Sequence, residues 1–342
     1  MSELDATVDS RREADVEFEE TRMEWLASYL NTRVYVPAKI ILGDWRGRVG
    51  LSLLIAYFIM GTLGIIWTDR PLYGEGARRM PAFISAQHPM GTNQFGEDLM
   101  RQIIHSTPEM LLIVFGGATF AIVVAAIVGL TAGYKGGPTG QALMTFTDIA
   151  LTLPGLPLII VLIAVFQPQH PIITGVVLSI NAWAGLARTL HSETLSLREE
   201  SYVEASTLMG VRLHSILLKD ILPNVMPYIA VNYMNAARNV IFAAVALYYL
   251  GLLPHRQENW GTMLDNGFET VNIMHPTEAT MFYIPLLVIV FFSVGLILLA
   301  QSMDALFNPR IRARHEERDR EREAHTAPEE EPRAGDEMPQ SV

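Results

Sequence analysis

The sequence contains no cysteine, and its only lysines are Lys39, Lys135 and Lys219. The absence of cysteine excludes disulfides, thiolate nucleophiles and zinc–thiolate sites. None of the lysines follows the glycines of a G-x-x-x-x-G-K-[ST] phosphate loop, so the chain has no such ATP site of its own. The nine histidines are scattered, and no H-E-x-x-H is present. The sequence therefore predicts no bound metal, no bound cofactor and no catalytic residue.

Basic residues are also scarce relative to acidic ones. The chain has 36 acidic and 25 basic residues and a net charge of −11, which argues against nucleic acid as a partner. An acidic, lysine-poor prokaryotic protein would suit a salt-rich cytoplasm, such as that of a halophilic archaeon. GC-rich coding, which exchanges lysine for arginine, would produce the same bias.

Charge is nearly absent from long stretches of the chain. Half of the residues are hydrophobic and the mean hydropathy is +0.25. An apolar helix of about 20 residues crosses the hydrocarbon core of a bilayer. We therefore predict an all-α, multi-pass protein of the cell membrane with six transmembrane helices. The six predicted spans are Val49–Trp67, Pro108–Ala132, Leu143–Phe166, Pro171–Leu190, Pro223–Leu250 and Met281–Ala300.

Proline and glycine mark several expected helix ends. Thr107-Pro108-Glu109 reads as N-cap, N1 and N2 of the second span, and Gly136-Gly137-Pro138 as the turn after it. Pro154, Gly155 and Pro157 lie inside the third span and predict a bent helix there.

Arginine and lysine are distributed asymmetrically between the two sides. If both termini are cytoplasmic, most basic residues are also cytoplasmic, which agrees with the positive-inside rule. The chain then divides into a cytoplasmic segment 1–48, a helix 49–67, an extracellular segment 68–107, a core 108–301 and a charged, disordered tail 302–342. Residues 15–29 place aromatic residues among acids, and form either an interfacial or docking helix or a solvated leader.

The longest internal cytoplasmic loop, residues 191–222, contains two short helical patterns. The stretch 201–209 is helix-forming and is stopped by Gly210. A second, amphipathic stretch places Leu213, Ile216, Leu217 and Ile221 on one side and ends where the fifth span begins. We expect a helix, tight turn, helix unit that lies along the membrane.

Within this loop the spacing of Glu204-Ala205, Gly210 and Leu222-Pro223 resembles the EAA motif of permease subunits of ABC importers. Further blocks resemble the C-type permease of dipeptide and oligopeptide importers, over roughly residues 45 to 310. These blocks are His88-Pro89-Met90-Gly91-Thr92, Ser196-Leu197-Arg198-Glu199 and Asn259-Trp260-Gly261-Thr262-Met263-Leu264.

The resemblance implies an ABC type I importer permease fold and a set of partners. These would be a second homologous permease, two ATPase subunits that use ATP and Mg, an extracellular substrate-binding protein, and the lipid bilayer. The short helix would enter a groove on the ATPase, with Glu204 bonding to it, Ala205 allowing close approach and Gly210 turning the chain. Peptides are the implied cargo; related importers carry nickel, glutathione or oligosaccharides.

The chain departs from the family pattern at several positions. Ser206 replaces the second alanine of the motif, and Asp220 stands where the motif usually has isoleucine. In the outer half, Glu97 replaces a usual arginine, Thr107-Pro108-Glu109 replaces an arginine-containing stretch, and Tyr248-Tyr249 replaces Ser-Phe. These outer differences concern the substrate and the docking of a binding protein.

Polar residues recur along the fifth span. Tyr228, Asn232, Asn235 and Asn239 follow one another at steps of four, three and four, with Arg238 beside them. They would share one face and line a hydrated pathway, or they would hold neighbouring helices by hydrogen bonds.

Three further polar residues lie in the third and fourth spans. Asn181 is a pathway candidate, with a packed interior position as its alternative. Asp148 and Arg188 are expected at similar depth and predict a structural ion pair.

Two other functional classes remain to be compared with the importer. An autonomous channel or secondary transporter explains the spans and the polar face but not the EAA-like loop. An intramembrane enzyme would need a nucleophile and base, or metal ligands, at membrane depth; Ser179 and Ser293 have no histidine at helical spacing.

Overall fold

The computed structural model describes residues 41–254, 259–270 and 279–307, and all of its regular elements in those ranges are helices. The expected all-α class is therefore confirmed for this part of the chain. The leader at 15–29, most of the tail and Arg256 lie outside the described residues.

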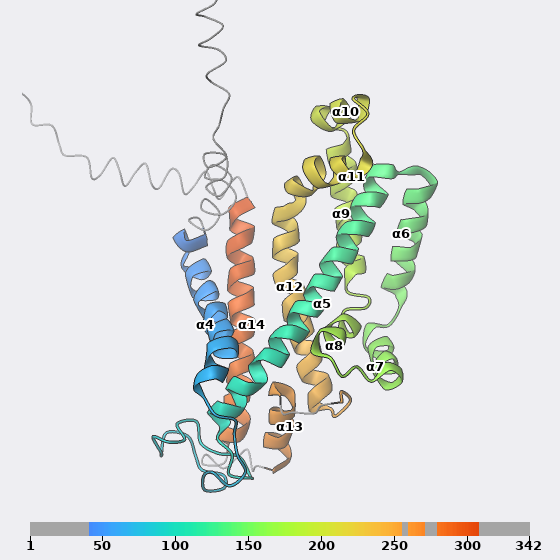
Figure 1. Ribbon diagram of the computed structural model, residues 1–342. Coiled ribbons are helices and arrows are strands. Elements are labelled where there is room, and N and C mark those ends of the chain that lie inside the picture. The colour runs from blue at the N-terminus through green and yellow to red at the C-terminus, as the bar shows by residue number, and fades with distance from the viewer. Residues whose placement is uncertain (1–40, 255–258, 271–278, 308–342) are drawn as a thin grey trace, which may run out of the picture.

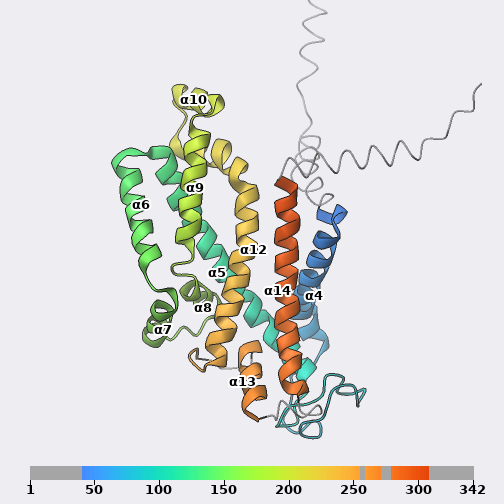
Figure 2. The same ribbon diagram turned by 180° about the vertical axis from the view of Figure 1, so that it is seen from behind.

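The first and last expected spans are present as paired helices. α4 (Trp45–Trp67) begins after Asp44, whose carboxylate accepts from the Arg46 amide, and lies beside α14 (Thr280–Phe307) along its length (Figures 1 and 2). Tyr57, Trp260 and Phe292 meet edge to face between them, with ring centroids 5.1 to 5.6 Å apart. These two helices form one edge of the molecule.

The second span is a longer helix than the sequence predicted. α5 (Leu99–Lys135) has 37 residues and begins at the N-cap Asp98, so the expected start at Thr107 and Pro108 is wrong. Pro108 lies inside the helix, where it removes one backbone donor. In the same turn the hydroxyl of Thr107 donates to the Ile103 carbonyl at 2.6 Å. Residues 99–107 therefore belong to α5.

The third span is sharply bent and is divided into two helices. α6 (Gly137–Thr152) and α7 (Gly155–Phe166) meet at 87° across Leu153 and Pro154. Both residues have extended backbone, which agrees with the restriction that a proline places on itself and on the residue before it. The bend expected from the proline and glycine residues is confirmed in position, and it is sharp enough to divide the span into two helices.

The fourth span is also broken, and here the prediction of one continuous helix was wrong. α8 (Pro171–Leu178) and α9 (Trp183–Arg198) meet at 65°. Residues 179–182 contain neither proline nor glycine, so no local signal marks the break. Trp183 is buried there, donates from Nε1 to the Ile180 carbonyl at 2.9 Å, and stacks on Phe146 of α6. Tertiary contacts thus decide this geometry.

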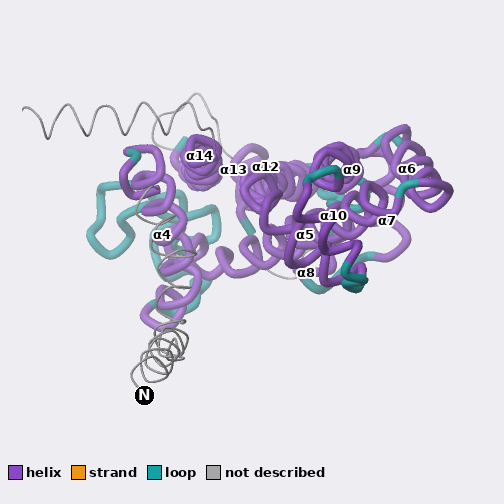
Figure 3. Tube along the Cα trace, turned by 90° about the horizontal axis from the view of Figure 1, so that it is seen from above, coloured by secondary structure: helices purple, strands orange, loops and turns teal. Residues whose placement is uncertain are grey.

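The remaining helices complete the bundle. α10 (Ser201–Leu208), the single turn α11 (Leu213–Ser215) and the π-helical η2 (Ile216–Ile221) lead into α12 (Leu222–Tyr249), which matches the expected fifth span. α13 (Trp260–Thr270) was not expected; it packs on α14 and α12. Viewed from the α10 end, α14, α12, α9 and α6 follow one another in a row, and α5 lies along one side of this row (Figure 3).

Three helices of the described chain, α4, α5 and α14, are individually long and apolar enough to cross a membrane. The pairs α6–α7 and α8–α9 bring the number to five if each pair forms one span. α12 has the length of a span, but its asparagines and its arginine lower its hydropathy.

Glycines let α5 approach its neighbours closely. A Cβ on Gly117 would lie 2.7 Å from the Gly175 carbonyl oxygen of α8, and one on Gly129 would lie 2.5 Å from the Ala187 carbonyl oxygen of α9. A Cβ on Gly133 would lie 2.6 Å from Thr194. Small residues at such crossings allow the van der Waals contact that holds membrane helices together. α5 is therefore the helix on which α8 and α9 are packed.

Adding one methyl group at this crossing should loosen it. We expect Gly129→Ala to destabilise the fold by about 1–3 kcal/mol, because its Cβ meets backbone atoms that cannot move aside. Gly185→Ala is the matched control, since nothing lies within 4 Å of its Cβ. Thermal unfolding of the purified protein in detergent measures both. An equal midpoint for the two variants would contradict this packing account.

Candidate functional site

The loop with the EAA-like spacing projects from one end of the molecule (Figure 1). α10 ends at Leu208, and Gly210 turns the chain with φ +72°. The Gly210 amide donates to the Thr207 carbonyl and the Val211 amide to the Ser206 carbonyl, which satisfies the last carbonyl groups of the helix. α11 and η2 form the second arm. The expected helix, tight turn, helix unit is therefore present.

Side chains of α10 divide into one buried anchor and an exposed surface. Val203 is fully buried against the bundle, whereas Glu204 and Ala205 are exposed. Leu208 and Met209 are 82% and 75% exposed at the tip. Leu222 and Pro223 are half-buried where α12 begins. An acidic group, a small residue and an apolar tip on a projecting helix form a surface suited to a partner protein.

Tyr202, in the first turn of α10, has a raised pKa. Burial of the phenol is the main cause, and the carboxylates of Glu200 and Asp220 add to it. The phenol is thus protonated at neutral pH.

A pocket lies behind α10, next to the end of α5. It has a volume of about 550 Å³ and is lined by Tyr134, Arg198, Glu199, Glu204 and Thr207. Glu204 is thereby placed at the boundary between the exposed face of α10 and the bundle.

The predicted ion pair is present in the structure. Arg188 of α9 donates to the carboxylate of Asp148 on α6, and both side chains are more than half exposed. The pair joins α6 to α9, two helices that also pack on each other.

The polar residues of α12 lie on the face away from its buried side. Asn232 donates from Nδ2 to the Tyr228 carbonyl at 2.8 Å. Asn235 and Arg238 are half-buried and Asn239 is exposed, so the face is only partly covered by the described bundle. Asn181 lies at the α8–α9 break, where its Nδ2 would be 3.1 Å from a Cβ built on Gly155 of α7.

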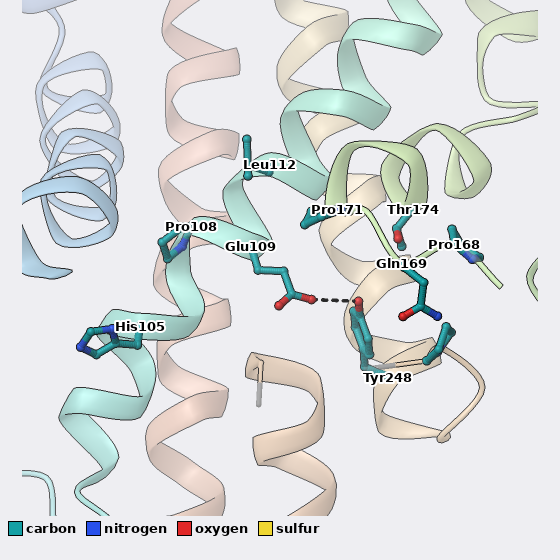
Figure 4. Close-up of a pocket in the computed structure, with 10 residues that line it drawn as sticks. His105, Pro108, Glu109, Leu112, Pro168, Gln169, Pro171, Thr174 and Tyr248 are labelled. Carbon is teal, nitrogen blue, oxygen red and sulfur yellow. Dashed lines mark hydrogen bonds between the residues drawn. The ribbon is translucent and has the colours of Figure 1, made fainter. Parts of the chain in front are cut away.

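At the opposite end from α10, a second pocket of about 330 Å³ lies between α5, α12 and the start of α8. Figure 4 shows Glu109 pointing toward Tyr248, whose hydroxyl donates to Glu109 Oε1 at 3.2 Å. Gln169 and Thr174 line the other wall. Sequence reasoning noted Glu109 and Tyr248 only as separate departures from the family pattern. The structure brings them into contact.

The block that begins at His88 forms a buried polar network outside the bundle. His88 Nδ1 lies 2.8 Å from Asp98 Oδ2. Glu97 is 7% exposed and accepts from the amides of Asn93 at 2.5 Å and Gln102 at 2.7 Å. Glu97 is therefore a structural residue that ties the outer segment to the first turn of α5. Among the described residues, no three histidine or acidic side chains are grouped as metal ligands.

The positive φ at Gly210 yields a prediction about the turn. Gly210→Ala should lower stability by about 1–2 kcal/mol, because a side chain strains the left-handed conformation, and Gly210→Asn should cost less. Gly43→Ala, which nothing approaches within 4 Å and which lacks a positive φ, is the control. Thermal unfolding midpoints compare the three. Equal midpoints for Gly210→Ala and the control would count against a required turn.

Known proteins resemble this chain in sequence. Residues 121–313 match the model of the family described as binding-protein-dependent transport system inner membrane component. The dipeptide transport system permease protein DppC of Bacillus subtilis is 28% identical over 223 residues, which cover 65% of this chain and 69% of that protein. The oligopeptide transport system permease protein OppC of Haemophilus influenzae is 32% identical over 181 residues, 53% of this chain and 58% of that protein.

A solved structure was also found. The MetNI methionine ABC transporter in an inward-facing conformation matches 58% of this chain and 95% of its own, with 15% identity and a TM-score of 0.44. The sequence relatives named above are bacterial and give no support to a halophilic archaeal origin. The family match covers more than half of the chain and includes α10 and α12. The chain therefore belongs to the family of binding-protein-dependent transport system inner membrane components, as the EAA-like loop predicted.

Proposed function

We propose that this importer permease carries peptides across the cell membrane and takes its energy from separate ATPase subunits. The observation that supports this most directly is the projecting helix α10, which presents Glu204 and Ala205 beside an apolar tip. The named relatives are dipeptide and oligopeptide permeases, which favours peptides over nickel, glutathione or oligosaccharides as cargo.

The proposed complex contains a second homologous permease, two ATPase subunits and an extracellular binding protein. ATP and Mg would be bound by the ATPases, since this sequence has no phosphate loop. In the proposed topology the chain has six spans and both termini are cytoplasmic. α10 then lies on the cytoplasmic side of the membrane, and the segment between α4 and α5 lies on the extracellular side. The three single helices, the two bent pairs and α12 are the six candidate spans.

The polar face of α12 supplies the proposed pathway lining. Asn232, Asn235, Arg238 and Asn239 are only partly covered in the single chain, and hydrocarbon is a poor environment for amides and a guanidinium. A second permease opposite this face would enclose a hydrated space where these groups can bond to peptide amides and carboxylates. Asn181 stays a candidate for the same pathway, at the α8–α9 break.

An ATPase that docks on α10 would drive alternating access of this pathway. The alternative, an autonomous channel or secondary transporter, would also use the polar face. It would not need α10, and this difference separates the two functions by experiment.

Reversing one charge on α10 should abolish coupling. We expect Glu204→Arg to reduce ATP-driven peptide uptake at least about tenfold in proteoliposomes of the co-expressed complex. The substitution replaces the carboxylate proposed to bond to the ATPase with a group of the opposite charge, which that contact would repel. Glu193→Arg is the matched control, since Glu193 is an exposed glutamate of α9 outside the motif.

A second variant tests the turn in the same assay. Gly210→Pro should have the same effect as Glu204→Arg, because proline cannot adopt φ +72°. Normal uptake by both variants, or uptake without ATP, would show that the protein transports autonomously.

A further inference from the structure

α10 is joined to the bundle by a side-chain hydrogen bond at each of its ends. In its last turn, Thr207 Oγ1 lies 3.0 Å from the hydroxyl of Tyr134. In its first turn, the hydroxyl of Tyr202 accepts from Asn224 Nδ2 at 3.1 Å. Tyr134 is in the last turn of α5 and Asn224 in the first turn of α12. We call these two contacts the α5 tether and the α12 tether.

The donor and acceptor of each tether follow from the other bonds of the same groups. Thr207 has one hydroxyl proton and donates it to the Val203 carbonyl at 2.9 Å, so Tyr134 is the donor to Thr207. Asn224 Nδ2 has two protons; one goes to the Asp220 carbonyl at 2.6 Å and the other to Tyr202. Each tether is therefore one hydrogen bond with a defined donor and acceptor. The hydroxyl proton of Thr207 and both Nδ2 protons of Asn224 are used in these bonds.

The α5 tether is attached to a fixed point. Arg198, at the end of α9, donates from Nη1 to the Tyr134 carbonyl at 3.3 Å, which places a cation at the negative end of the α5 dipole. Between the tethers, Val203 is fully buried in a cluster with Leu130 and Ile216. α10 is therefore held at its centre by apolar packing and at both ends by polar bonds.

Both tethered helices run the length of the bundle. α5 extends from Tyr134 to the outer segment at Leu99, and α12 extends from Asn224 to Tyr249 (Figures 1 and 2). Near the outer ends the two helices are bonded again, by Tyr248 and Glu109. α12 also carries the polar face. A displacement of α10 can therefore be passed through two hydrogen bonds to α5 and α12, which extend to the opposite end of the molecule.

We propose that Tyr134, Thr207, Tyr202 and Asn224 are positioning residues that transmit movement of α10 to α5 and α12. The inference rests on the proposed function, because the ATPase that moves α10 is part of that proposal. A neutral hydrogen bond is worth enough to change an equilibrium about fivefold. Loss of a tether should therefore lower the amount of peptide imported per ATP hydrolysed by about this factor and leave ATP hydrolysis itself within about twofold of its wild-type rate.

Removing single oxygen atoms tests this in the full complex with its ATPases, second permease and binding protein in proteoliposomes. Tyr134→Phe and Tyr202→Phe should each lower the imported peptide per ATP about fivefold, and together about twenty-fivefold, because the tethers are separate. The double variant Tyr134→Phe with Thr207→Val should import an amount of peptide per ATP within about twofold of that of Tyr134→Phe alone. Both substitutions remove the same hydrogen bond, so the second adds little to the first.

Two control variants retain the tethers. Thr207→Ser retains the hydroxyl and should retain the wild-type ratio. Tyr283→Phe removes a tyrosine hydroxyl from α14, away from α10, and should also retain it. Rates are normalised to assembled complex, which is measured by size-exclusion chromatography, so a variant that assembles poorly is still compared per complex.

The possible outcomes are distinct. Wild-type ratios in both Tyr134→Phe and Tyr202→Phe would overturn the inference. A proportional fall of uptake and ATP hydrolysis would also overturn it, because the residues would then serve only to hold the ATPase. Failure of the wild-type complex to import peptide with ATP would refute the proposed function, and the inference with it, before any variant is compared.

Discussion

The close crossing of α5 with α8 and α9 is the contact on which the rest of the structure depends. Gly117, Gly129 and Gly133 bring backbone against backbone, and a single Cβ would approach carbonyl or side-chain atoms to 2.5–2.7 Å. In a membrane there is little hydrophobic force between helices, so such close van der Waals contact is a main source of stability. α9 is held by this crossing, and α10 follows directly after its C-terminal end.

α5 also connects the two ends of the molecule. Its first turn is bonded to the outer segment through Gln102 and Glu97, and its last turn is bonded to α9 and α10 through Tyr134. Pro108, inside α5, lies next to Glu109, which accepts a hydrogen bond from Tyr248 of α12. Energetic coupling between distant sites can be carried by chains of packed and hydrogen-bonded side chains. In this chain those contacts converge on α5 and α12.

Sequence reasoning found the features that depend on composition and local conformation. The apolar runs located four of the helices, and Gly210 located the turn after α10, because only glycine adopts φ +72° without strain. It also placed Asp148 opposite Arg188, since two charges at similar depth in apolar helices are expected to pair. It misplaced the start of α5, because a proline that usually begins a helix is tolerated inside a membrane helix.

By itself, the sequence determined that the chain is helical, that it is built for a membrane, and that its loop at 201–223 carries the signature of its family, since hydrophobic runs and glycine positions are local properties. Only the tertiary structure decided the break between α8 and α9, the contact of Glu109 with Tyr248, and the two bonds that hold α10. Each of these joins residues from different helices, or depends on one helix packing against another, and no local pattern encodes such a meeting.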